Sequence, residues 1–187
     1  MDKQTFWKLI ETARADRAAG AAAGPAAGPA AGRVEVADRV AQLLAERPGP
    51  EIAAAQQVLW DLLAESYRAP LWAAAYVING GCSDDGFDYF RGWLLTQGEA
   101  VFAAALADPD SLAAHPEVRE AAARGLELWD EEALSMAWRA YASATGRSLP
   151  AESFTISYPP LDPSWDFDFA DTSRTAPRLP RLTALFA

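Results

Sequence analysis

The chain has 187 residues, of which 51% are hydrophobic and seven are Trp, so it can bury the core of one globular domain. Its formal net charge of −10 argues against nucleic-acid binding, which depends on clustered Lys and Arg, and against docking on anionic membranes. One Cys and one His cannot supply a zinc site, and we expect no cofactor and no resident metal.

The N-terminal segment MDKQTFWKLIE is charged and amphipathic, whereas a secretory signal needs an uninterrupted apolar block. No apolar run approaches the roughly 20 residues that span a bilayer. We therefore expect a cytoplasmic protein without a membrane segment.

Apolar residues recur at helical spacing through the first 147 residues. This periodicity predicts helices over residues 3–19, 33–47, 51–68, 70–79, 84–97, 99–107, 116–124 and 126–147. The Gly-, Pro- and Ala-rich residues 20–32 are predicted to form a flexible insert. The only strand candidate is FTISY, residues 154–158. The predicted fold class is all-α: one compact multi-helix domain at residues 1–150, with a Pro-, Asp- and aromatic-rich C-terminal tail at 151–187 that packs on it.

The boundaries of the helix over 84–97 are predicted from both ends. Asn79-Gly80-Gly81 stops the preceding helix, because glycine adopts the left-handed conformation without steric cost. Ser83 is placed as the N-cap of the next helix, where a negative charge on Asp84 and Asp85 favours the helix dipole. Gly98 then follows the C-terminus.

The signature segment, NGGCSDDGFDYFRGWLLTQG at residues 79–98, resembles the bacterial domain-of-unknown-function family 4240. Further similarity lies in TFWKLIE near the start, in LWAAAYVI directly before the signature segment, and in WDFDF and LPRL near the end. The resemblance thus covers nearly the whole chain. It implies a family identity, but no activity, substrate or catalytic residue.

Three carboxylates can crowd one face of the first turns of the signature helix. Asp88 lies three residues after Asp85 and four after Asp84. Such a cluster can hold Mg²⁺ or Ca²⁺, with further ligands from tail residues such as Asp162, or can share a proton. The favoured interpretation is that the first two cap the helix while Asp88 pairs with Arg91 on its solvated face.

Aromatic residues occupy much of the same helix. Phe87, Phe90 and Leu94 share one stripe, and Tyr89 and Trp93 lie four residues apart beside it. The stripe is interpreted as core, with the alternative that one aromatic edge beside Asp88 and Arg91 forms a concave recognition site. Cys82 is interpreted as buried rather than reactive. His115 is not expected to act as a general base for a Cys82 nucleophile.

The function is unknown from sequence, and whether the protein is an enzyme stays open. The first hypothesis is a non-catalytic binding module that recognises a peptide, protein or small molecule through Asp84, Asp85, Asp88, Tyr89, Arg91 and Trp93. The alternative is a divalent-metal enzyme built on Asp84, Asp85 and Asp88. A third hypothesis is a homodimer contact at the signature segment.

Overall fold

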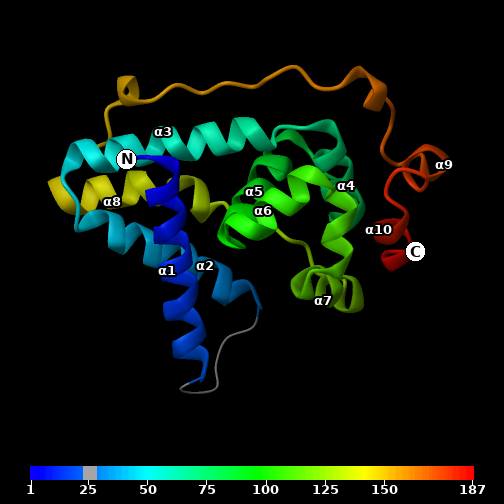
Figure 1. The fold of residues 1–187 in the computed structure, drawn as a ribbon, viewed down its shortest axis with the longest axis horizontal. Helices are drawn as coiled ribbons and strands as arrows, with labels where there is room; N and C mark the ends of the chain where they lie inside the picture. Colours follow the sequence, from blue (N-terminus) through cyan, green and yellow to red (C-terminus); the bar gives the residue numbers. More distant parts are fainter. Residues whose placement is uncertain (23–28) are drawn as a thin grey trace.

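The computed structural model describes residues 1–22 and 29–187, and within these residues every regular element is a helix (Figure 1). The all-α fold class is therefore confirmed. The α-helices are α1 (Lys3–Ala22), α2 (Pro29–Ala45), α3 (Gly49–Ser66), α4 (Ala69–Asn79), α5 (Asp84–Thr96), α6 (Glu99–Ala107), α7 (Pro116–Arg124), α8 (Met136–Thr145), α9 (Thr172–Thr175) and α10 (Pro180–Leu185). Short 3₁₀ helices are η1 (Pro109–Ala114), η2 (Glu132–Ser135), η3 (Ala151–Ser153) and η4 (Pro163–Trp165).

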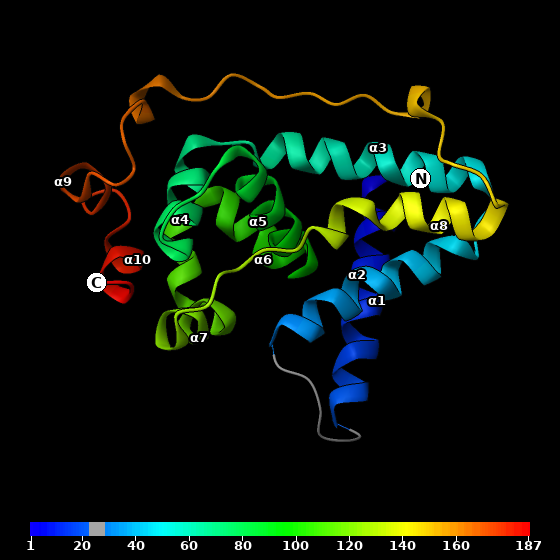
Figure 2. The same ribbon diagram turned by 180° about the vertical axis from the view of Figure 1, so that it is seen from behind.

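Helix α5 lies at the centre of the molecule and packs against α1, α2, α3, α4, α6 and η2. Its aromatic residues Phe87, Phe90 and Trp93 are fully buried, which confirms that the aromatic stripe is core. Helices α1, α2, α3 and α8 pack together on one side of α5, and α4 and α7 lie on the other (Figures 1 and 2). Helix α6 lies next to α5 and also reaches α1, where Phe102 contacts Trp7 with ring centroids 5.3 Å apart. A helix that is apolar on most faces takes a central place, because those faces must be covered by other helices.

The predicted ends of α4 and α5 are confirmed. Helix α4 ends at Asn79, and Gly80 follows in the left-handed conformation with φ of 66°. The Ser83 side chain accepts a hydrogen bond of 3.1 Å from the Gly86 amide and so caps α5. Gly98, with φ of 91°, separates α5 from α6.

Two predictions of regular structure are wrong. The helix expected over 126–147 begins only with η2, because residues 126–130 run extended after Gly125 ends α7 and Glu131 forms a bend. FTISY is extended but pairs with no strand in the described chain. Of the predicted insert, residues 20–22 and 29–32 belong to α1 and α2, and residues 23–28 lie outside the described part.

The C-terminal tail docks at the far end of the molecule, where α10 contacts α4 and η1. Asp110 of η1 is buried and accepts hydrogen bonds from the backbone amides of Arg181 and Leu182, at 3.0 and 2.8 Å. The Arg181 side chain pairs with the same carboxylate at 2.9 Å. Asp110 therefore serves as an N-terminal cap supplied to α10 from another element.

Replacing Asp110 with Asn is expected to weaken this docking by about 2 kcal/mol, because hydrogen bonds to a charged group are lost. Burial opposes ionisation, but the bonds from Arg181 and Leu182 prevail, and the pKa of Asp110 is lowered. Because the pKa of Asp110 is lower in the folded than in the unfolded state, its carboxylate stabilises the fold fully at pH values above its unfolded-state pKa of about 4. This stabilisation is lost as the pH falls through the pKa of the folded state. Urea unfolding from pH 6 to 3 should show the difference between wild type and variant shrinking below about pH 4.

The matched control is Asp108→Asn, which affects the other carboxylate that pairs with Arg181. That pair is more than half exposed on both sides, so its loss should cost less than about 1 kcal/mol. Equal losses from the two variants would contradict the role of Asp110 as a cap.

Candidate functional site

An open pocket of about 380 Å³ lies where the signature segment meets residues 126–131, which link α7 to η2. We refer to it as the signature pocket. One wall comes from the α4–α5 turn and the first turns of α5, through Asn79, Gly81, Cys82, Ser83, Gly86 and Tyr89. The other wall comes from Glu127, Trp129 and Glu131.

The second wall follows from the alternation of an extended chain. Leu128 and Asp130 point inward and are 1% and 3% exposed, whereas Trp129 between them is 51% exposed. Glu127 and Glu131 are also exposed. Because side chains alternate along an extended backbone, residues 127 and 129 project from the same side of the chain. Glu131 lies at the bend directly before η2, with helical backbone angles, and lines the pocket beside them.

Four contacts fix the two walls to each other. The Asn79 side chain donates to the Leu128 carbonyl at 3.1 Å and accepts from the Leu128 amide at 2.9 Å. The Asp130 amide donates to the Tyr89 carbonyl at 2.9 Å, and the Tyr89 hydroxyl donates to Glu131 at 3.4 Å. At Gly92 the chains meet so closely that a Cβ atom would lie 2.3 Å from the Asp130 carbonyl oxygen. The pocket is thus built into the tertiary structure and needs no closure to form.

The electrostatic environment of the pocket is negative. The charge of Glu131 first, then burial, then the charge of Asp85 raise the pKa of Tyr89 above its ordinary value. Burial raises the pKa of the Cys82 thiol to about 12, so at neutral pH it is an uncharged thiol and a poor nucleophile. The interpretation of Cys82 as buried is corrected in part, because its side chain is only half-buried and lines the open pocket. His115 packs edge-on against Trp93, at 5.7 Å between ring centroids.

The predicted binding residues are spread over separate places in the structure. Asp84 and Asp85 are exposed in the first turn of α5, next to the Ser83 cap, as expected for capping residues. Tyr89 lines the signature pocket. Trp93 is fully buried, and its indole N–H donates to Glu117 at 2.8 Å.

Asp88 and Arg91 form the predicted ion pair, but the prediction that it lies on a solvated face is wrong. The Arg91 side chain is 0% exposed, and it also donates to the carbonyls of Leu63 and Phe87. Its guanidinium group lies 5.1 Å from the ring centroid of Tyr67 and 4.7 Å from that of Phe87. Arg91 therefore joins α5 to α3 from inside the core.

Part of the tail covers this ion pair. The tail strap, residues 154–162, runs extended alongside α3 (Figures 1 and 2). Thr155 exchanges two hydrogen bonds with the Gln57 side chain, and Phe154 stacks on Trp60 with ring centroids 6.5 Å apart. The Tyr158 hydroxyl donates to Asp88 at 3.3 Å. Both carboxylate oxygens of Asp88 therefore have a partner, Oδ1 in Arg91 and Oδ2 in Tyr158.

The three carboxylates of the metal hypothesis do not converge, since Asp88 faces Arg91 and the other two lie in solvent. Within residues 1–22 and 29–187, no group of three or more His, Cys, Asp or Glu side chains is placed to hold a metal ion. No helix in the same described ranges has the length and apolar character to cross a membrane.

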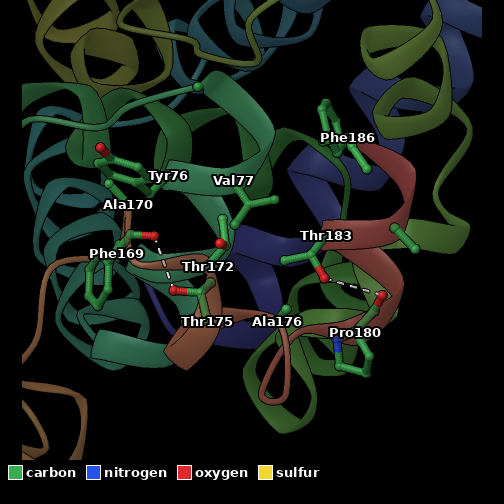
Figure 3. A pocket seen from close by; sticks show the side chains of 13 residues that line it. Tyr76, Val77, Phe169, Ala170, Thr172, Thr175, Ala176, Pro180, Thr183 and Phe186 are labelled. Carbon is green, nitrogen blue, oxygen red and sulfur yellow. Dashed lines mark hydrogen bonds between the residues drawn. The ribbon is translucent and has the colours of Figure 1, made fainter.

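A second, larger pocket of about 730 Å³ lies between α4 and the C-terminal helices (Figure 3). Tyr76 and Val77 of α4 face Phe169, Thr183 and Phe186 of the tail, and no charged side chain lines the pocket. The hydroxyls of Thr175 and Thr183 donate to backbone carbonyls, as Figure 3 shows, which leaves an apolar surface.

The fold and the signature pocket together define a small all-α protein whose signature segment forms a wall of a ligand-sized pocket. The chain belongs to the family described as "Protein of unknown function (DUF4240)", whose model matches residues 1–143. No curated protein and no solved structure is significantly similar to it. The match contains the whole signature pocket, whereas WDFDF, LPRL and the tail half of the apolar pocket lie outside it.

The site residues predicted from the sequence did not include Glu127, Trp129 and Glu131, because residues 126–131 were predicted to be helical. The signal that could have found them is the alternation of Leu126 and Leu128 with Glu127 and Trp129, directly after Gly125. That alternation is typical of a half-buried extended segment.

Proposed function

We propose that the protein is a non-catalytic binding module and that the signature pocket is its recognition site. The observation that carries this proposal is Trp129, a large aromatic side chain that is 51% exposed inside a preformed pocket. An indole surface left in water loses the stabilisation that burial would provide, and in pockets such surfaces commonly contact ligands. The residues on either side of it, Leu128 and Asp130, are buried, so Trp129 is the large side chain that this segment presents to the pocket.

The location of the pocket supports the same proposal. All its lining residues fall within the stretch that matches the family, and six of the nine belong to the signature segment. Signature residues outside the lining also contribute, since Gly92 permits the close approach of Asp130. The ligand class envisaged from sequence, a peptide, protein or small molecule, stays a prediction, as do the cytoplasmic location and the absence of nucleic-acid and membrane partners.

The test is a protein-observed NMR screen with fragments that include equal numbers of anionic, neutral and cationic members. We expect binding fragments to shift the amide resonances of Gly81 and Gly86 and the indole resonance of Trp129. Trp129→Ala should abolish the shifts at the two glycines. Trp165→Ala, which removes a tail indole outside the pocket, should leave them unchanged. Fragments that shift only residues of the apolar C-terminal pocket, or none at all, would overturn the proposal.

A further inference from the structure

We propose that the signature pocket takes an organic cation, namely an ammonium or guanidinium group carried on an apolar stem. This inference rests on the proposed function and specifies the ligand class of the same site. The first observation is the order of side chains on the extended wall. Trp129 lines this wall together with Glu127 and Glu131, so the exposed indole shares the pocket with a carboxylate from either side of it along the chain.

This order suits a cation in two ways. The face of an indole attracts an ammonium or guanidinium group placed over it, and Trp is the strongest of the aromatic residues in this interaction. The carboxylates on either side can then accept charge-assisted hydrogen bonds from the same group. No Lys, Arg or His lines the pocket, so no basic side chain of its own walls neutralises Glu127 and Glu131.

The opposite wall disfavours the alternative, an anion at the N-terminus of α5. The Gly86 amide is already bonded to the Ser83 side chain, and the Phe87 amide to the Ser83 carbonyl at 2.8 Å. Asp84 and Asp85 also place negative charge at the positive end of the helix dipole. An incoming anion would find these donors occupied and would be repelled by four carboxylates.

The remaining surface of that wall accommodates an apolar stem. Tyr89 contributes a second aromatic ring, whose orientation is fixed by its hydroxyl bond to Glu131. The Cys82 thiol is uncharged, and the glycines at 81 and 86 leave the backbone free of side chains. A volume of about 380 Å³ is near the small end of ligand pockets, which suits one side-chain-sized group rather than a folded surface.

The experiment measures binding of butylammonium and butylguanidinium by the Gly86 amide resonance, with 1-pentanol and pentanoate as neutral and anionic probes of similar size. We expect saturable shifts with the two cations and at least tenfold weaker binding of the other probes. The double variant Glu127→Gln/Glu131→Gln should weaken cation binding about tenfold, which corresponds to about 1.4 kcal/mol. Glu132→Gln removes a carboxylate next to Glu131 that does not line the pocket, and binding should stay within about twofold.

Two blocked amino acids, N-acetyl-lysine methylamide and N-acetyl-arginine methylamide, distinguish the source of the cation. Tighter binding than the free alkyl cations indicates a side chain of a peptide, and weaker binding indicates a free small amine; both support the proposal. Pentanoate or pentanol binding as tightly as the cations would overturn it, as would unchanged cation binding in the double variant. If the fragment screen finds ligands in the pocket while every cation fails, this inference fails and the proposed function stands.

Discussion

Asp88→Asn is expected to destabilise the protein by about 3 kcal/mol, because it leaves the buried Arg91 guanidinium without its carboxylate partner. Arg91 has no exposed surface, and its other hydrogen-bond partners are neutral carbonyls. Burial lowers the pKa of Arg91 and the charge of Asp88 opposes this, so the carboxylate is what compensates the buried charge. Urea unfolding followed by far-UV circular dichroism measures the difference.

Asp84→Asn and Asp85→Asn are the matched controls, since they make the same substitution on the same helix. Both side chains are exposed and act only through the helix dipole, so each variant should lose less than about 1 kcal/mol. Three similar losses would contradict the role of Asp88 as the partner of a buried Arg91. A stability of Asp88→Asn equal to that of the wild type would lead to the same conclusion.

Gly92→Ala is expected to destabilise the fold by about 1 to 3 kcal/mol through overpacking, although alanine ordinarily favours a helix. The new Cβ would lie 2.3 Å from the Asp130 carbonyl oxygen and 3.3 Å from the Ala133 Cβ. The first of these atoms belongs to backbone and cannot rotate away. The segment that carries Trp129 must therefore shift, and ligands of the signature pocket should bind more weakly. Thermal unfolding and the NMR titrations report the two effects.

Gly20→Ala provides the control for the substitution itself. Gly20 lies in α1, and a Cβ atom there would have no neighbour within 4 Å. Alanine at this position should leave stability unchanged or raise it by up to about 1 kcal/mol, because the helix propensity improves without a clash. A Gly92→Ala protein as stable as the wild type would contradict the close approach of α5 to residue 130.

The sequence by itself determined the helical class and the local chemistry of the signature segment. The Gly80 stop, the Ser83 cap and the pairing of Asp88 with Arg91 all involve residues within a few positions of each other, so sequence spacing reports them directly. The aromatic stripe likewise predicted a core helix, because burial of Phe87 and Phe90 follows from their periodicity.

Only the tertiary structure decided where these residues act. Spacing along one helix cannot tell that Arg91 points toward the Leu63 carbonyl of α3 or that Tyr158 covers Asp88. The signature pocket depends on Asn79 and Leu128, 49 residues apart, whose hydrogen bonds hold the extended residues 126–130 beside the start of α5. Helical propensity is a local preference. After Gly125 ends α7, tertiary hydrogen bonds stabilise the extended chain more than helix formation would.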